Sequence, residues 1–308
     1  MDRLQVIFAG SGEFGVPTLS ALLDAGHQIV QVISQPDRPA GRGRGLTPTP
    51  ISQFALDRGL PPLRTANINT EALPPADVLV VIAFGQKIAP HVVDHARLGS
   101  INLHASILPK YRGAAPINWA IIRGESITGN SVIRLAPRMD GGAVLGQSEL
   151  HIGEAETAGE LHDRLSKDGA PLVLRVLAQI ADGSAIERTQ DESRATIAPK
   201  LSREASRLDW ARPARELANQ VRGMYPWPGC RVQLVGGAHP VRVTLVRARA
   251  SEASLGEPGT IDRAGAVSTG EGSLEIVELQ PEGKRPMTLA AFRNGHAWEP
   301  GMRVESIA

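Results

Sequence analysis

The first half of the chain alternates short apolar runs with stretches of helical spacing, and this alternation constrains the fold most. Apolar, β-branched runs cover 4–9, 28–34 and 77–83, and a helical pattern over 16–25 ends at Gly26. The run 77–83 (DVLVVIA) is apolar at nearly every position, which predicts a strand buried on both faces. Strands that alternate with helices favour a mainly parallel sheet with right-handed crossovers, so we predict an α/β domain.

Further along this half, the pattern predicts three more strands and two more helices. The strands are expected over 99–104, 130–135 and 143–150, and the helices over 88–97 and near 157–180. The last two strands flank a turn at Asp140-Gly141-Gly142.

The sequence changes character after Asp182. Residues 196–209 are polar and linker-like, and a helical stretch over 213–222 stops at the proline-rich MYPWPGC. Turn residues then separate five short runs, which favours a small β-barrel; the runs are 231–235, 241–248, 259–261, 274–280 and 287–292. We therefore predict a first domain over 1–190, a linker over 191–208 and a barrel domain over 209–308.

Length and composition suit a globular protein of two domains. The chain has 308 residues, of which 42% are hydrophobic and 4% aromatic. Its apolar stretches are too short to span a membrane, and the amino terminus lacks a secretory pattern. The single cysteine, Cys230, cannot form an internal disulfide, which suits a reducing compartment. We expect a cytoplasmic protein that contacts no membrane.

Charge is balanced overall but unevenly distributed. The formal net charge is +1, which argues against a polyanion binder as a whole. Basic residues outnumber acidic ones over 194–249, whereas the preceding 149–192 is mainly acidic. This asymmetry indicates either a nucleic-acid contact on the carboxyl-terminal part or a solvated basic face.

Three glycines near the amino terminus, Gly10, Gly12 and Gly15, match the pattern G-x-G-x-x-G of dinucleotide-binding proteins. Such proteins need an acidic residue at the end of the second strand to hold the ribose hydroxyls. Here the second strand ends in Ser34-Gln35-Pro36. We therefore interpret the glycines as a tight turn where backbone segments approach closely.

A denser group of polar residues follows the strand predicted over 99–104. Asn102 and His104 are two apart, so both point to one side of an extended backbone. An amide donor beside an imidazole can stabilise a developing oxyanion, and Asp140 could orient that imidazole. Taken singly, His104 is more often a structural histidine and Asp140 more often a turn residue.

The combination is far more specific. The order Asn102-x-His104-x-Ser106-x-Leu108-Pro109, with Gly113 and then Asp140-x-Gly142, resembles the enzymes that transfer formyl from 10-formyltetrahydrofolate. Within that superfamily the chain resembles the methionyl-tRNA formyltransferase family, through SQPDRPAGRGRG (34–45), KLSREASRLDW (200–210) and PWPG (226–229). The resemblance implies a Rossmann-like catalytic domain, then a linker and a small OB-like β-barrel domain. It also implies that the glycine turn binds no dinucleotide.

The resemblance further implies how the site works. Asn102 and protonated His104 would hold the oxyanion of a tetrahedral intermediate, and Asp140 would orient His104 and help remove the amine proton. Formyl would pass from 10-formyltetrahydrofolate, a co-substrate, to the amino group of initiator methionyl-tRNA without a metal. The expected folate-binding residues are Ser106, Ile107, Leu108 and Pro109, with Phe84 and Gly85 as a wall of the pocket.

For tRNA the resemblance implies two regions. One is the basic loop over 36–50, which its prolines and glycines predict to be flexible without a partner. The other supplies phosphate contacts from the carboxyl-terminal part. The residues expected to bind tRNA are Arg38, Arg42, Arg44, Lys200, Arg203 and Arg207. We expect the protein to be a monomer.

Three alternatives stay open. Ala105 and Ile107 depart mildly from the family pattern, and PINWAII and APRMDGG lean toward formyltransferases that act on nucleotide-linked amino sugars. A dinucleotide-dependent dehydrogenase or binding module is a more remote reading of the glycine turn. His91 and His95 could form two ligands of a metal site, although an ordinary surface pair fits better because no third ligand lies nearby.

Overall fold

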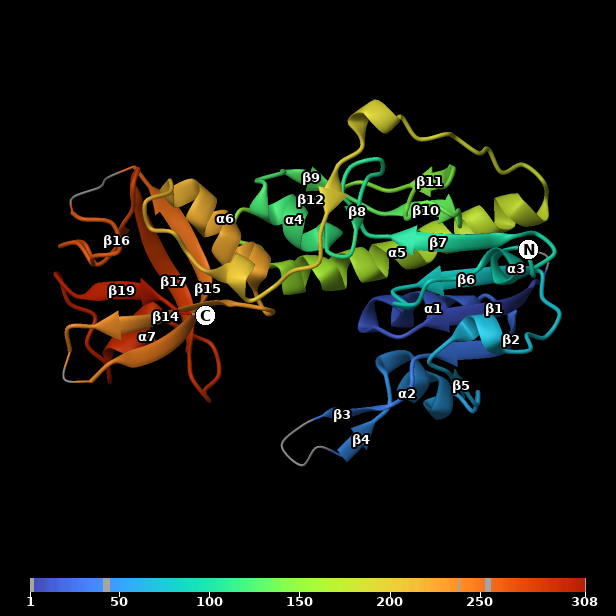
Figure 1. Cartoon of the computed structure of the whole chain (residues 1–308), viewed down its shortest axis with the longest axis horizontal. Coiled ribbons are helices and arrows are strands. Elements are labelled where there is room, and N and C mark those ends of the chain that lie inside the picture. The colour runs from blue at the N-terminus through green and yellow to red at the C-terminus, as the bar shows by residue number, and fades with distance from the viewer. Residues whose placement is uncertain (1–2, 41–44, 238, 253–255, 308) are drawn as a thin grey trace. The chain divides into compact units, whose positions relative to one another are not determined.

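The computed structural model describes residues 3–40, 45–237, 239–252 and 256–307 (Figure 1). The chain divides into two compact units that interleave along the sequence. Unit 1 comprises Met1–Gly113, Gly129–Leu150 and His162–Ile197, and unit 2 comprises Ala114–Thr128, His151–Leu161 and Ala198–Ala308. The predicted division into residues 1–190, 191–208 and 209–308 stays a prediction.

One sheet forms the centre of unit 1. Among its described residues, seven strands lie in the order β11–β10–β7–β6–β1–β2–β5. The strands are β1 Gln5–Gly10, β2 Gln28–Ser34, β5 Leu63–Arg64, β6 Val78–Ile82, β7 Ser100–His104, β10 Ser131–Arg134 and β11 Val144–Gln147. The first five are parallel to one another, and β10 runs antiparallel to both of its neighbours, β7 and β11. The predicted α/β fold with a mainly parallel sheet is confirmed.

Helices bury both faces of this sheet, which explains the apolar run at β6. On one face Ile7 of β1 belongs to a buried cluster with Val92. On the other face Phe8 and Ile51 lie against Gly10. The helices of unit 1 are α1 Val16–Asp24, α2 Pro50–Asp57, α3 Pro90–Val93 and most of α5 Ala158–Ala181, whose first turn belongs to unit 2.

The glycine turn at the end of β1 is required by packing. A Cβ on Gly10 would lie 2.9 Å from the Ile82 carbonyl oxygen and 2.9 Å from the Phe8 ring. A Cβ on Gly15 would lie 3.2 Å from Phe8 and 3.3 Å from Ile51. These glycines allow β1, β6 and α2 to approach closely, which gives the match to G-x-G-x-x-G an architectural cause.

Two predictions in unit 1 were wrong in detail. The helix expected over 88–97 is only the single turn Pro90–Val93, because the chain turns at Asp94 to bring Arg97 and Leu98 alongside the residues before β6. The basic loop expected to be flexible contains a hairpin, in which β3 Arg38–Ala40 pairs with β4 Gly45–Thr47. Arg42 and Arg44 lie outside the described residues.

Unit 2 is built around an antiparallel sheet. In its described part the strands are β14 Cys230–Val235, β15 Val241–Ser251, β16 Val267–Ser268, β17 Ser273–Pro281, β18 Met287–Thr288 and β19 Arg303–Ser306. They lie in the order β16–β17–β15–β14–β19, with β18 beside β17. Thr260 pairs with Arg303 of β19, and Ile261 pairs with Val267 of β16. Residues 259–261 thus join the two edges, and the predicted small barrel is confirmed.

The barrel interior is apolar and is covered by α6 Ala214–Met224. The helix α4 Pro116–Ile122 packs on α6. Trp298 and Phe292 are buried in the barrel interior with edge-to-face rings 6.5 Å apart. Cys230 is also buried, and burial raises the pKa of its thiol. The thiol therefore behaves as a small apolar side chain.

The run predicted as a strand over 287–292 is mostly helical. After the short β18, the Thr288 hydroxyl accepts a hydrogen bond from the Ala291 N–H at 3.2 Å and caps α7 Leu289–Arg293. Ala-Ala-Phe-Arg favours a helix once the cap is formed. The pattern of apolar residues alone did not reveal this N-cap.

Short elements complete the chain. They are η1 Glu13–Gly15, η2 Ile68–Thr70, β8 Arg112–Gly113, β9 Ile127–Thr128, β12 Leu150–His151, η3 Glu192–Arg194, β13 Ile197–Ala198 and η4 Glu204–Ser206. Within the described residues, every helix is too short or too polar to cross a bilayer.

A charged cluster in unit 2 joins the barrel to the first turn of α5. Arg247 of β15 donates to the Glu160 carboxylate at 2.9 Å and to the Glu278 carboxylate at 2.9 Å. The same guanidinium donates to the Ala155 carbonyl at 2.6 Å. The hydrogen bond from Arg247 lowers the pKa of Glu160 to about 2, and hydrogen bonds from Thr157 act in the same direction.

This cluster predicts a pH-dependent stability difference. Because the pKa of Glu160 is lower in the folded state, its contribution is present above about pH 4.5 and is lost as the pH falls toward 2. We expect Arg247→Gln to lower the free energy of unfolding by about 1 kcal/mol at pH 7. Urea titrations at several pH values should show this difference shrinking between pH 4.5 and pH 2. Arg242→Gln, on the same strand but ion-paired to no described residue, is the matched control, and an equal loss there would contradict the prediction.

Candidate active site

The sheet order reverses beside β1, at the carboxyl ends of β1 and β6. The chain adds β2 and β5 on one side of β1 and then returns to add β6 on the other side. Open α/β sheets bind their ligands at such a reversal. Hydrogen bonds tie this edge together, since the Phe84 carbonyl accepts from Ser11 Oγ at 3.2 Å and from Gln35 Nε2 at 2.7 Å. His104 ends β7, the strand next to β6.

The structure brings His104 and Asp140 together. His104 is 7% exposed, and its Nδ1 lies 3.6 Å from Asp140 Oδ1. On the other side of the ring, Nε2 lies 2.9 Å from the Tyr111 carbonyl oxygen. Both ring nitrogens therefore face oxygen atoms, at hydrogen-bond distance for Nε2 and at ion-pair distance for Nδ1. Asp140 also accepts a hydrogen bond from the Gly113 N–H at 2.8 Å, which fixes the direction of its carboxylate.

Asn102 lies on the same face of β7 as His104, two residues earlier. Its backbone pairs with Val81 on one side and Ile133 on the other, so its position is set by the centre of the sheet. The side chain is half-buried and makes no hydrogen bond to any described residue. Its amide is thus available as a donor beside the imidazole.

Backbone strain concentrates around these residues. Within the described chain, the non-glycine residues with positive φ are Ala83 at 46°, Tyr111 at 63° and Asp140 at 51°. Ala83 follows β6, Tyr111 supplies the carbonyl that faces His104, and Asp140 faces the same imidazole. Left-handed backbone at non-glycine residues is unfavourable and tends to occur where function requires a particular geometry.

The segment 106–109 is anchored to β10 and β11. The Ser131 hydroxyl donates to the Ser106 carbonyl at 2.6 Å and accepts from the Leu108 N–H at 3.0 Å. Gln147 donates to the Leu108 carbonyl at 2.9 Å. Leu108 packs in a buried cluster with Ile133 and Val144. Ile107 and Pro109 are the half-buried members of the segment, so they are the ones within reach of a ligand.

The other predicted site residues have distinct surroundings. The Phe84 side chain belongs to the buried cluster of Ile7 and Val92, while Gly85 is exposed with a φ of 76°. Arg38 is exposed on β3 and donates to Gln35. Lys200, Arg203 and Arg207 are exposed in unit 2, before α6.

The two histidines considered as metal ligands contact backbone carbonyls. His91 Nε2 lies 3.1 Å from the Asn69 oxygen, and His95 Nε2 lies 2.8 Å from the Pro74 oxygen. Across the part of the chain that the structure describes, no three histidine, cysteine or acidic side chains form a cluster that could hold a metal ion.

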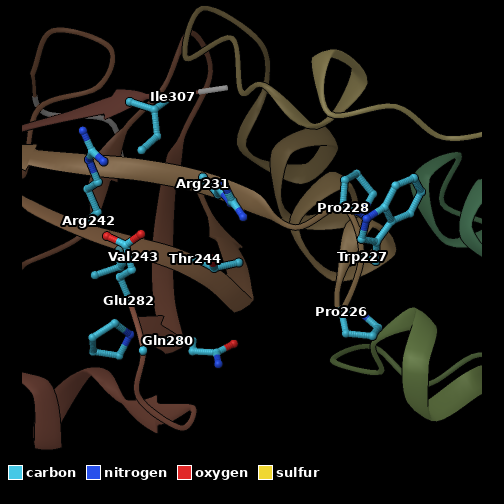
Figure 2. A pocket seen from close by; sticks show the side chains of 12 residues that line it. Pro226, Trp227, Pro228, Arg231, Arg242, Val243, Thr244, Gln280, Glu282 and Ile307 are labelled. Atoms are coloured by element: carbon cyan, nitrogen blue, oxygen red, sulfur yellow. The ribbon is translucent and has the colours of Figure 1, made fainter. Parts of the chain in front are cut away.

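A cavity of about 450 Å³ lies on the barrel. Its floor includes Val243, and Arg231 and Arg242 project from neighbouring strands beside it (Figure 2). Trp227, 53% exposed, lines the cavity from a separate loop. Sequence analysis missed this grouping, because Trp227 was noted only as part of the PWPG motif.

Comparisons with known proteins agree with the motif. A family model described as formyl transferase matches residues 2–177, and one described as formyl transferase, C-terminal domain, matches 200–297. The methionyl-tRNA formyltransferase of Acidobacterium capsulatum is 42% identical, over 98% of this chain and 99% of its own. That of Bacillus licheniformis is 38% identical, over 97% of this chain and 98% of its own.

The chain belongs to the methionyl-tRNA formyltransferase family. Solved structures of other proteins share the fold of this chain. The sugar 3N-formyl transferase WlaRD, solved with dTDP and 5-N-formyl-THF, matches with a TM-score of 0.67 at 19% identity, over 92% of this chain and 100% of that one. HypX from Aquifex aeolicus, solved with tetrahydrofolic acid, matches with a TM-score of 0.62 at 18% identity, over 94% of this chain and 47% of that one.

The packing of the turn that carries Asp140 predicts that alanine substitutions at two neighbouring glycines, Gly141 and Gly142, lower the stability by different amounts. A Cβ on Gly142 would lie 1.8 Å from the Arg134 carbonyl oxygen, whereas one on Gly141 would meet only the flexible Arg138 side chain at 3.2 Å. We expect Gly142→Ala to cost about 1–3 kcal/mol of stability, because the turn must move away from β10. Gly141→Ala is the matched control and should cost far less. Thermal melts of both variants test the contrast, and equal losses would show that close packing at Gly142 is unimportant.

Proposed function

We propose that this chain transfers the formyl group of 10-formyltetrahydrofolate to the α-amino group of initiator methionyl-tRNA, producing N-formylmethionyl-tRNA. The observation that carries the proposal is the pairing of His104 with Asp140 beside Asn102, in a chain of this family. The named relatives cover nearly all of the chain, including the barrel. The single buried thiol, Cys230, suits a protein of the cytoplasm.

Asn102 and His104 would stabilise the negative charge that develops during transfer. When the amino nitrogen bonds to the formyl carbon, the C=O pair moves to oxygen and a tetrahedral intermediate forms. The Asn102 amide would donate to that oxygen, and the Nε2–H of His104 would join it by exchanging the Tyr111 carbonyl for the oxyanion. Preorganised donors of this kind each contribute roughly 3–4 kcal/mol. Both residues lie on one face of β7, which directs both donors to the same side of the sheet.

Asp140 would orient His104 and accept the proton that the attacking amine loses, directly or through water. Its carboxylate is fixed by the Gly113 N–H and lies against His104 Nδ1. Collapse of the intermediate re-forms the C=O bond and breaks the bond to N10 of the folate, which takes up a proton. An N-formyl group on an aryl amine is an activated donor, so the residues need to supply positioning and charge stabilisation only.

The segment 106–109 and the residues that follow β6 would hold the folate. Ile107 is half-buried, and its N–H donates to no described residue, so it is available to a pterin. The anchoring of Ser106 and Leu108 to Ser131 keeps this backbone fixed. Gly85, exposed at the end of β6, would leave room for the ligand, while buried Phe84 supports it from the core.

For tRNA we propose contacts from two regions. Arg38, Arg42 and Arg44 follow β2 and would contact the acceptor end, whereas Lys200, Arg203 and Arg207 would contact phosphates. The barrel cavity adds Trp227, Arg231 and Arg242, and an exposed aromatic ring beside arginines without described ion pairs suits RNA. No second copy of the chain is needed for these roles, so we propose a monomer.

The decisive assay measures formyl transfer from 10-formyltetrahydrofolate to methionyl-tRNA, with nucleotide-linked amino sugars as competing acceptors. We expect formylation of methionyl-tRNA and none of the sugars. Preferential formylation of a sugar would overturn the proposed acceptor but leave the formyl-transfer centre in place. Failure of transfer to every amine would overturn the proposed function.

The catalytic roles predict large losses of turnover without loss of folding. Asn102→Ala and His104→Ala should each lower kcat about a hundredfold or more, because each removes one oxyanion donor. Thermal melts and tRNA binding should stay close to those of the parent. His91→Ala is the matched control, because the hydrogen bond of this exposed histidine goes to the Asn69 carbonyl, away from His104. A near-normal kcat in either test variant would remove that residue from the catalytic group.

The two tRNA regions predict different kinetic effects. Arg42→Ala should lower transfer to methionyl-tRNA strongly, because the loop would position the aminoacyl end. The double variant Lys200→Ala, Arg203→Ala should mainly raise the KM for tRNA and flatten its salt dependence by about one unit per lost phosphate contact. Steady-state rates at several salt concentrations test both. Parent-like rates for Arg42→Ala at all salt concentrations would exclude the loop from tRNA positioning.

A further inference from the structure

The loop that carries Asp140 needs support from outside its own strands. β10 runs antiparallel to β7, so the chain leaves β10 with Arg134 beside Ile101, three residues before His104. The loop 135–143 must then bring Asp140 back to the imidazole with a left-handed backbone at φ 51°. Its own turn contributes the hydrogen bond from the Gly141 N–H to the Arg138 carbonyl at 3.1 Å. That bond closes the turn but does not fix it relative to His104.

Gln190 supplies the fixed support. Its side-chain nitrogen Nε2 donates to the Asp140 carbonyl at 2.7 Å and to the Gly142 carbonyl at 2.8 Å. Both carbonyls lie on the carboxyl-terminal side of the Asp140 Cα, so Gln190 holds the turn that begins at this strained residue and thereby fixes the backbone from which the carboxylate projects. Gln190 is buried, which makes both hydrogen bonds inaccessible to competing water.

Arg112 in turn fixes Gln190. Its guanidinium is 2% exposed and donates to Gln190 Oε1 from Nε at 3.0 Å and from Nη2 at 2.7 Å. This pairing determines the amide orientation, because the reverse orientation would place N–H groups against the guanidinium and an oxygen against two carbonyls. Arg112 also pairs with the carboxylate of Glu192 at 2.9 Å, and this hydrogen bond lowers the pKa of Glu192 below its ordinary value.

The same short stretch of chain holds both sides of the imidazole. Arg112 lies between Tyr111, whose carbonyl faces His104 Nε2, and Gly113, whose N–H holds the Asp140 carboxylate. The Arg112 N–H donates to the Thr196 carbonyl at 2.9 Å, which ties this stretch to the segment that carries Gln190. The segment 190–196 therefore braces both neighbours of His104.

We propose that Gln190 is a positioning residue for Asp140, and that buried Arg112 holds Gln190 in the orientation this requires. The inference rests on the proposed function, in which Asp140 acts through His104. Gln190 touches none of the reacting groups, and its effect would pass entirely through the backbone of residues 140–142.

Gln190→Glu is the sharpest test, because glutamate keeps the shape and the acceptor for Arg112 but lacks the donor to the two carbonyls. We expect kcat to fall about ten- to a hundredfold, with the KM for folate and for tRNA within about twofold of the parent. Asp140→Asn removes the carboxylate charge beside His104 and should shift the pH profile of kcat. We expect Gln190→Glu to shift the pH profile in the same direction. Unchanged kcat and pH profile would overturn the proposal.

A double-mutant cycle separates positioning from general stability. If Gln190 acts through Asp140, adding Gln190→Glu to Asp140→Asn should lower kcat by no more than about twofold beyond Asp140→Asn alone. If the two single-variant losses of kcat multiply in the double variant, the proposal is wrong. Asp191→Asn is the matched control, since the side chain of this exposed neighbour of Gln190 accepts its hydrogen bonds from Ser193, and the change should leave kcat within about twofold.

A readout independent of activity distinguishes this inference from the proposed function. The ¹⁵N shifts of the His104 ring report on the partner of Nδ1, and they should differ between the parent and Gln190→Glu even if no acceptor is formylated. Identical ring shifts would overturn the positioning role. If Gln190→Glu fails to fold, Gln190→Met takes its place. This variant removes both the N–H donor to the two carbonyls and the oxygen acceptor for Arg112, and the same results would support or overturn the proposal.

Discussion

The site depends on holding one acidic residue in an unfavourable backbone conformation next to an imidazole. Asp140 has a positive φ, and its carboxylate must still meet both the Gly113 N–H and His104. Close packing of Gly142 against the Arg134 carbonyl leaves the turn little freedom. Aspartate tolerates this backbone better than most residues do, and the buried hydrogen bonds around the turn fix it in place.

The fold was largely predictable where a segment's own pattern determines its structure. The strand predicted over 28–34 matches β2 at both ends, and the helix predicted near 157–180 matches α5 within one residue. Prediction failed where local chemistry competes with the apolar pattern. The N-cap at Thr288 turned an expected strand into α7, and α2 went unpredicted, although Thr49 caps it and Pro50 begins it.

The residues proposed to act on the substrate were predictable from the sequence, but the residues that hold them in position were not. Asn102, His104 and Asp140 were found because their residue types and order form a specific motif, and the structure brings His104 and Asp140 together. Gln190 and Arg112 were missed, because a glutamine that bonds to carbonyls 48 and 50 residues away leaves no local pattern. Buried polar partners of this kind can be identified only once the three-dimensional path of the backbone that they hold is known.

The interleaving of the two units limits how the chain can be divided. Unit 2 takes Ala114–Thr128 and His151–Leu161 from the first half of the sequence. A fragment that begins at 198 would keep every barrel strand but would lose α4 and the Glu160 partner of Arg247. It would expose the apolar surface that Trp119 and Ile122 cover on the core of unit 2, which includes α6. A single cut therefore cannot release an intact carboxyl-terminal unit, and any recombination between relatives must exchange three separate stretches together.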